Sequence, residues 1–259
     1  GISGTTTPTV SGTTFVNIAS FVYQAGAGDT TVATATTYNT LRGSNNTPVR
    51  LGGATIATDV HLDSTNVSLT TMGNNLTTKT VNNSGTLTLS ADTTLTFTDL
   101  SGCGFGSSSG TLVSAGTEAE PNTITSSGTP TNYWSTDSNS MSFNADFTTF
   151  DKSNRVLIQA NKSQAIDNCT FTNGKNNQIP IYIAAPAPSS LSFTDNTITA
   201  NTSSDAFRSD IAHTGFDNIV ITNAGAGGDV YTNNVKLEFT NSNFDVDEVT
   251  LNGSAANVI

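Results

Sequence analysis

The sequence is poor in charge, and above all in basic residues. Of 259 residues only 9 are Lys or Arg, against 20 Asp or Glu, which gives a formal net charge of −11. The basic residues form no cluster that could neutralise a phosphate backbone or bind an anionic lipid surface. We therefore expect neither nucleic acid nor an anionic membrane as a partner, and the acidity is typical of a solubilising surface.

Long hydrophobic runs are missing as well. No apolar run approaches the roughly 20 residues that a membrane-spanning helix needs, so we expect no membrane span. Hydrophobic residues make up 35% of the chain and aromatic residues 7%, which is too little for a thick globular core. No stretch shows helical periodicity. Thr, Asn, Ser and Gly dominate instead, a composition that favours strands and tight turns around a thin core.

Cysteine and histidine are scarce. Cys103 and Cys169 lie 66 residues apart, and His61 and His213 are also distant from each other. These spacings exclude a zinc motif. In an oxidising compartment the two cysteines would form one disulfide. In the alternative they are two small buried thiols, as the apolar-alternating position of Cys169 indicates.

One short phrase returns four times in the second half of the chain. It consists of an apolar residue, an Asp-Asn or Asn-rich pair, and then alternating apolar and Thr or Asn positions; the copies begin at Ile166, Phe193, Phe216 and Phe239. The three Asp-Asn pairs are 28 and 22 residues apart. A repeat of this length is typical of a β-solenoid, in which each coil buries a few side chains against its neighbours. Such regular alternation is not expected of a disordered chain.

The first half shows the same period in another form. Short apolar pairs recur, each separated by one polar residue, which places the pair on the inner side of a strand. The pairs are Val49/Leu51, Val60/Leu62, Val67/Leu69, Leu87/Leu89 and Leu95/Phe97. Three such strands with their turns make a coil of about 24 residues, so the chain predicts one continuous rod of about ten coils rather than two domains.

Three segments depart from this pattern. Residues 1–35 begin with a Gly-, Ser- and Thr-rich stretch and contain the densest apolar strand, 15–23, so we expect a distinct N-terminal arm or cap before a solenoid over 36–259. A loop-rich, irregular stretch is expected over about 102–140. In 179–188 two prolines oppose ladder pairing, which predicts a strand that leaves the stack at a loop.

Residues 38–53, 73–77 and 83–89 resemble the repeats of secreted bacterial and archaeal surface β-helix proteins. The later Asp-Asn phrases resemble right-handed parallel β-helices of the pectate-lyase-like type, and the resemblance covers roughly residues 37–255. It implies an all-β fold, a right-handed parallel β-helix. It also implies an extracellular adhesin, surface-layer or filament component, with polysaccharide-active enzymes as the other common occupants of the fold.

An enzyme would need charged residues that converge on one face of the rod. The one such concentration comprises Asp205, Arg208, Asp210, His213 and Asp217. A carboxylate pair there could act as acid and base in glycoside cleavage, with Arg208 binding an anionic sugar. No residue-by-residue match to a lyase or hydrolase motif is present. We therefore predict no catalytic residues and a polar loop in which Arg208 pairs with a neighbouring Asp.

Two further groups of residues have the composition of a binding site, one for calcium and one for a sugar. Calcium ligands are conceivable, but no calcium motif supports them, so we predict no metal site and no cofactor. The candidate ligands are Asp245, Asp247 and Glu248, with Asp29 or Asp229 in Gly-rich turns. Tyr133-Trp134 is an aromatic pair that could stack on a sugar. The alternative is a loop anchored by its own Trp.

The ends of the rod indicate the function. Residues 251–259 contain no charge and no amphipathic helix that would cap the last coil. Uncapped sheet edges pair with other chains, and a head-to-tail contact that does not close generates a filament. We predict a self-assembling extracellular structural subunit of a filament or surface layer, its partner being itself, with residues 1–23 as a strand donated to the neighbour. The alternative is a monomeric β-helix that binds or cleaves polysaccharide. The start at Gly1 without a leader is compatible with a processed mature protein.

Overall fold

The computed structural model describes strands from residue 13 to residue 258, with gaps. Side chains are described mainly between Leu69 and Asp245. The described ranges are 13–15, 22–25, 30–32, 36–38, 40–43, 48–51, 54–56, 59–62, 68–71, 76–78, 80–98, 104–106, 109–129, 133–136, 141–159, 162–175, 178–225, 227, 230–245, 249–252 and 257–258.

These residues form three parallel sheets of 12, 10 and 11 strands. Sheet I contains β1 (Thr13–Phe15), β3 (Thr30–Val32), β6 (Pro48–Leu51), β9 (Ser68–Thr71), β12 (Thr86–Leu89), β15 (Thr111–Ala115), β18 (Ser142–Asp146), β21 (Ser163–Asp167), β24 (Ser190–Thr194), β27 (His213–Asp217), β30 (Lys236–Thr240) and β33 (Asn257–Val258). Sheet II contains β4 (Thr36–Tyr38), β7 (Ala54–Ile56), β10 (Leu76–Thr78), β13 (Thr94–Phe97), β16 (Asn122–Ser126), β19 (Thr148–Asp151), β22 (Thr170–Thr172), β25 (Thr197–Ala200), β28 (Val220–Asn223) and β31 (Asn243–Asp245). Sheet III contains β2 (Val22–Ala25), β5 (Thr40–Gly43), β8 (Asp59–Leu62), β11 (Thr80–Asn83), β14 (Gly104–Phe105), β17 (Trp134–Ser135), β20 (Ser153–Ile158), β23 (Ile181–Ile183), β26 (Phe207–Ser209), β29 (Val230–Asn233) and β32 (Val249–Asn252).

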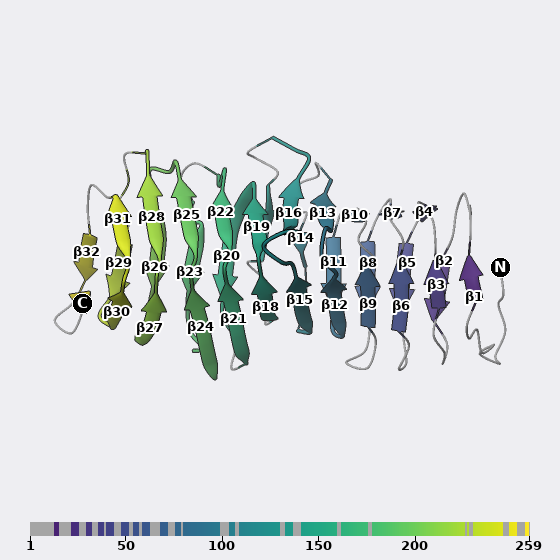
Figure 1. Cartoon of the computed structure of the whole chain (residues 1–259), viewed down its shortest axis with the longest axis horizontal. Helices are drawn as coiled ribbons and strands as arrows, with labels where there is room; N and C mark the ends of the chain where they lie inside the picture. The colour runs from purple at the N-terminus through teal and green to yellow at the C-terminus, as the bar shows by residue number, and fades with distance from the viewer. Residues whose placement is uncertain are drawn as a thin grey trace.

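The chain forms a solenoid. Later coils visit sheets I, II and III in turn, so that strands three apart in the sequence pair in parallel, as β12 does with β15. The result is a right-handed parallel β-solenoid, which confirms the predicted fold class. Figure 1 shows the two ends of the chain at opposite ends of a rod. All secondary structure in the described ranges is strand, and they contain no helix able to cross a membrane.

The segments that depart from the repeat still supply strands to the sheets. Within residues 1–35, β1 pairs with β3 and β2 pairs with β5 of the following coil. In the loop-rich stretch, β14 to β17 all take places in the three sheets, although β14 and β17 are only two residues long. β23 pairs on both sides. The prediction that a strand within 179–188 leaves the stack is therefore wrong for β23 itself, which stays in the sheet. The chain leaves the hydrogen-bonded ladder only after β23.

The four copies of the repeated phrase stack at one corner, between sheets I and II. Phe193 lies opposite Phe216, and Phe216 opposite Phe239, in neighbouring strands. Two residues after each phrase begins, the backbone turns with a positive φ, of 54°, 55°, 52° and 52° at Asn168, Asp195, Asn218 and Asn241. Asn and Asp tolerate this left-handed conformation better than other non-glycine residues. The Asp-Asn pairs themselves are out of register by one residue, which changes the 27- and 23-residue spacings of the apolar residues to 28 and 22.

Two buried asparagines join successive coils at the same corner. The Oδ1 atom of Asn196 accepts a hydrogen bond of 2.9 Å from the backbone N–H of Cys169, and its Nδ2 donates one of 2.7 Å to the carbonyl of Ile166. Asn122 bonds in the same way to Thr93 N–H and Leu89 carbonyl. These amides satisfy backbone groups of the turn that the parallel ladders leave unpaired.

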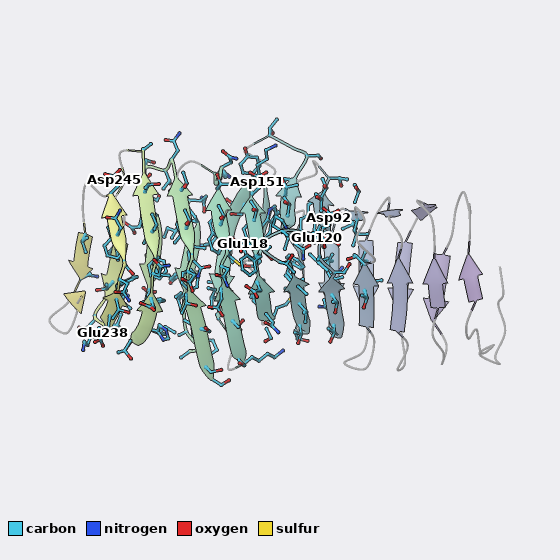
Figure 2. The ribbon with its side chains drawn as sticks, in the orientation of Figure 1. Asp92, Glu118, Glu120, Asp151, Glu238 and Asp245 are labelled. Carbon is cyan, nitrogen blue, oxygen red and sulfur yellow. The ribbon has the colours of Figure 1, made fainter. Side chains whose placement is uncertain are left out.

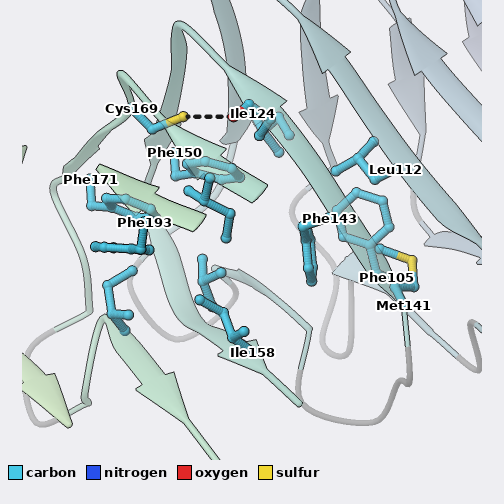
Figure 3. Close-up of a cluster of buried hydrophobic side chains, with 14 of the residues drawn as sticks. Phe105, Leu112, Ile124, Met141, Phe143, Phe150, Ile158, Cys169, Phe171 and Phe193 are labelled. Atoms are coloured by element: carbon cyan, nitrogen blue, oxygen red, sulfur yellow. Dashed lines mark hydrogen bonds between the residues drawn. The ribbon is translucent and has the colours of Figure 1, made fainter. Parts of the chain in front are cut away.

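The core is a narrow column of rings and aliphatic side chains between the three sheets. Inward residues alternate with outward ones, and Leu87, Leu89, Leu95 and Phe97 are fully buried, as the sequence pairs predicted. Ring contacts continue from coil to coil; Phe150 and Phe171 stack with centroids 4.8 Å apart (Figure 3). Each such aromatic pair adds about 0.5–1.5 kcal/mol beyond the area it buries.

Candidate functional sites

The most distinctive polar feature on the surface is a row of alternating Arg and Tyr on sheet III. It comprises Arg155, Tyr182, Arg208 and Tyr231, which we call the Arg–Tyr strip. Tyr182 lies opposite Arg208, and Arg208 opposite Tyr231, because they occupy outward positions in register on β23, β26 and β29. The guanidinium carbon of Arg208 lies 5.0 Å from the Tyr182 ring centroid and 4.7 Å from that of Tyr231. These are cation–π distances.

Asp210 holds the centre of the strip together. Arg208 Nε donates to Asp210 Oδ1 at 3.0 Å, and Arg208 Nη2 donates to Asp210 Oδ2 at 3.2 Å. The Tyr182 hydroxyl donates to the same carboxylate. Burial, followed by this hydrogen bond, raises the pKa of Tyr182. The prediction that Arg208 pairs with a neighbouring Asp is confirmed.

The other residues of the predicted charged concentration lie elsewhere. His213 and Asp217 belong to β27 of sheet I, whereas Arg208 belongs to sheet III. Asp205 is half-buried in the connection before β26. The carboxylate of Asp210 is paired with a guanidinium rather than with a second carboxylate. Of the five residues, Arg208 and Asp210 are in direct contact, through two hydrogen bonds.

His213 packs as part of the wall of the solenoid. Its ring lies 4.5 Å from that of Phe216, at a register shift between β27 and β30. The Nε2 atom is buried and has no hydrogen-bond partner in the described part of the chain. Burial lowers the pKa of His213 because the charged imidazolium loses its hydration there. The neutral ring is thus the form that the fold prefers.

This gives a testable pH dependence. Because the folded-state pKa of His213 lies below the ordinary value of 6.5, the unfolded chain binds a proton first as the pH falls. The stability that His213 contributes is complete above 6.5, and it is lost as the pH falls through the folded-state pKa. We expect the wild type to lose more free energy of unfolding than His213→Gln between pH 6.5 and about 5, measured by urea unfolding. Parallel pH profiles for the two proteins would contradict this.

Asp217 belongs to a ladder of Asp and Asn along the corner between sheets I and II. Each Asn Nδ2 donates to a carboxylate of the preceding coil: Asn168 to Asp146 at 2.9 Å, Asn218 to Asp195 at 2.7 Å and Asn241 to Asp217 at 2.8 Å. The Thr240 hydroxyl also donates to Asp217, and these hydrogen bonds lower its pKa, that from Thr240 having the larger effect. The ladder links successive coils at the surface. The Asp-Asn pairs do not predict it, because its Asn donors lie two residues after the apolar residue of their phrases and the pairs are not all at that position.

The calcium candidates receive no structural support. Asp245 is exposed at the end of β31, near the C-terminal end of the rod in Figure 2. Asp247, Glu248, Asp29 and Asp229 lie outside the described residues. Within the described ranges no three His, Cys, Asp or Glu side chains come together as metal ligands would.

The aromatic pair Tyr133-Trp134 is not an exposed stacking platform. Trp134 is fully buried, and its indole N–H donates to the carbonyl of Asp151 at 2.8 Å. It contacts the rings of Phe97, Phe105 and Phe150. The alternation of β17 points it inward, so the alternative of a segment anchored by its own Trp is the correct one.

Cys169 is a buried free thiol. Its Sγ atom lies 3.1 Å from the carbonyl oxygen of Asp167 and 3.6 Å from that of Ala145, and the single thiol proton is shared between these acceptors. Figure 3 shows Cys169 beside the buried rings of the core. Burial raises its pKa to about 12. Cys103, the other half of the disulfide considered from the sequence, lies outside the described residues, and Cys169 fits the buried-thiol alternative.

Among the described strands, each of the three sheets ends in an edge strand at both ends of the rod. At one end the last strands of sheets I, II and III are β33, β31 and β32; at the other they are β1, β4 and β2. Each of these strands pairs on one side only with described strands. Near the C-terminal end, Phe239 and Phe244 pack on the core but are only partly buried, and Val249 is 39% exposed.

Comparison of the chain with protein-family models, with curated proteins and with solved structures finds no match. The class that the chain itself defines is thus the parallel β-solenoid, on the evidence of its three parallel sheets.

Proposed function

We propose that the protein is a self-assembling structural subunit that polymerises end to end outside the cell. The observation that carries this proposal is that all three sheets terminate at the same two ends, in parallel edge strands. A second copy placed in line would extend the three sheets together: β33 toward β1, β31 toward β4 and β32 toward β2. Unpaired edges of this kind are templates for pairing with another chain.

The apolar content of the C-terminal end supports the same contact. Val249 is the one large hydrophobic side chain that is clearly exposed in the described part of the molecule. The partly buried Phe239 and Phe244 continue the aromatic column toward this end, with ring centroids 5.0 Å apart. Stacking of a further coil would remove these groups from water, which is favourable in proportion to the apolar area buried.

The geometry of such a contact favours a filament. The two ends of the rod are different surfaces, so the contact is heterologous, and a heterologous contact without a closing rotation propagates indefinitely. The scarcity of Lys and the abundance of Thr and Asn are typical of an extracellular setting, and we include that setting in the proposal.

Substitution of Val249 tests the end-to-end contact. We expect Val249→Lys to abolish fibres in negative-stain images and to leave a slowly sedimenting species, because a lysine on an edge strand opposes pairing. The control is Val113→Lys, an outward position of β15 on the side of the rod, which should assemble as the wild type does. Because Val249 is in register with the buried Val230, circular dichroism must also show that Val249→Lys keeps the strand content of the wild type. Fibres of equal length from both variants, or none from the wild type, would refute the contact.

Deletion of residues 1–23 separates two forms of assembly. If this segment is a strand donated to the neighbour, the shortened chain forms no fibres. If fibres form equally well, strand donation is wrong, and stacking through the edges exposed at the new end remains.

A second candidate function is glycan binding at the Arg–Tyr strip. The observation that favours it is the alignment of two guanidinium groups and two rings on one face of a chain with few basic residues. Asp210→Ala would release Arg208 and Tyr182 from their partner. A changed retention on immobilised acidic polysaccharide, or a loss of reducing-end release from it, would support this function over a purely structural one.

A further inference from the structure

The outer face of sheet II carries a two-dimensional array of threonines. Outward positions of its strands are occupied almost throughout by Thr, and these residues form two ranks along the rod, which we call the threonine lattice. The first rank is Thr94, Thr123, Thr149, Thr170 and Thr197; the second is Thr77, Thr96, Thr125, Thr172, Thr199 and Thr222. Strand pairing sets their register: Thr123 lies opposite Thr149, which lies opposite Thr170.

The lattice is regular because sheet II is regular. Register shifts occur between β17 and β20 and between β27 and β30, which belong to the other two sheets. The ten strands of sheet II pair without such a shift, and Figure 1 shows them in a continuous row. Neighbouring threonines in a rank are therefore about 4.8 Å apart, and the two ranks are separated by about 6.6 Å, two residues along a strand.

The hydroxyl groups of the lattice are available to an external partner. Thr125 donates to Asp151 at 2.6 Å, and it is the one lattice residue whose hydroxyl bonds to another residue in the described ranges. The lattice side chains are mostly half-buried, and Thr199 is exposed. Asp151 is the one charged side chain between Thr77 and Thr222 in either rank. The face is otherwise neutral, with hydroxyl and methyl groups in alternation.

The other two outer faces lack this order. Sheet III carries the Arg–Tyr strip, whose groups bond to one another. Sheet I carries Asn144, Ala165 and Asp146 among its outward positions. Of the three outer faces in the described part of the chain, only that of sheet II could therefore bind a partner that requires a repeating, uncharged array.

We propose that the threonine lattice binds the surface of ice. Hexagonal ice presents on its prism faces a rectangular net of oxygen atoms with spacings similar to those of the lattice. A single hydroxyl group contributes little binding free energy, because it exchanges a hydrogen bond to liquid water for one to ice. An array of hydroxyl groups in register contacts many water molecules of the ice surface at once. The combined binding is far stronger than any single contact. Stiff β-branched side chains, held by coil stacking, keep the array in place before contact.

The proposal is independent of end-to-end assembly, since it uses the side of the rod. The test is thermal hysteresis together with partition of the protein into a slowly growing ice hemisphere. We expect the wild type to enter the ice and to shape crystals, and Thr172→Tyr to lose most of both effects because the ring holds the lattice away from the ice surface. Thr88→Tyr is the matched control; it makes the same change at an outward position of β12 in sheet I and should retain both effects.

Circular dichroism and urea unfolding establish that the variants fold, and Thr197→Tyr replaces Thr172→Tyr if the latter does not. Exclusion of the wild type from ice would overturn the proposal, as would a lattice variant that remains fully active. Retention of the wild type on crystalline cellulose or chitin but not in ice, with loss in the lattice variants, would also overturn it and assign the face to a crystalline glycan.

Discussion

Trp134→Ala is expected to lower the free energy of unfolding by about 3–5 kcal/mol, the usual cost of removing a large buried ring. Trp134 is completely buried, and its ring lies between those of Phe97 and Phe150, with centroid distances of 5.9 Å and 6.1 Å. The substitution would leave a cavity in the column and would remove the hydrogen bond to the carbonyl of Asp151. A solenoid is held together by contacts between neighbouring coils, so this defect weakens both adjoining interfaces.

Urea unfolding followed by circular dichroism measures this loss. Trp134→Phe should lose less, since it keeps an aromatic ring in the column and forfeits mainly the N–H group. Tyr133→Ala, next in sequence and half-exposed, should cost about 1 kcal/mol, the centre of the usual range for point substitutions. Equal losses for Tyr133→Ala and Trp134→Ala would mean that the Trp does not anchor the core.

Asn196→Leu is expected to cost about 2–6 kcal/mol, because two backbone groups lose their partner inside the fold and each unsatisfied group costs about 1–3 kcal/mol. Those groups are the N–H of Cys169 and the carbonyl of Ile166. Leucine has a similar volume and is more hydrophobic, so a fold held by apolar packing alone would gain from the change. The sign of the change in the free energy of unfolding therefore distinguishes stabilisation by the hydrogen bonds of Asn196 from stabilisation by apolar packing alone.

The matched control lies at the same corner but on its surface. Asn218 has a φ of 52° and is exposed, and Asn218→Gly keeps a residue suited to that backbone. We expect a change of less than about 1 kcal/mol, the net worth of its one hydrogen bond to Asp195. A stabilising Asn196→Leu, measured by the urea midpoint and by thermal unfolding, would show that the buried amide does not hold successive coils together.

Much of the architecture follows from local patterns. Alternation in pairs such as Leu87/Leu89 predicted which side chains point inward, because a strand places successive residues on opposite faces. The repeat at Ile166, Phe193, Phe216 and Phe239 predicted stacked coils of similar length, and Phe193, Phe216 and Phe239 do lie opposite one another in neighbouring strands. The left-handed corner after each does not follow from the alternation, since it depends on one backbone angle that Asn and Asp both tolerate.

The surface sites were harder to predict. Arg208 and Asp210 are close in sequence, so their ion pair could be expected. Tyr182 and Tyr231 come from coils before and after them, and only the register of β23, β26 and β29 places them against Arg208. Trp134 was assigned to an exposed pair or an anchored loop because the surrounding residues lack a clear alternation, and burial decided between the two.

The sequence by itself determined the kind of fold: its low apolar content, alternating residues and repeats of similar length permit stacked coils and oppose a thick core. The tertiary structure alone decided which outward residues become neighbours along the rod. Coils of unequal length bring together residues at unequal separations, so the threonine lattice, the Arg–Tyr strip and the Asp–Asn ladder depend on strand register. Register is set by hydrogen bonds between coils, and these are not written in any one segment of the chain.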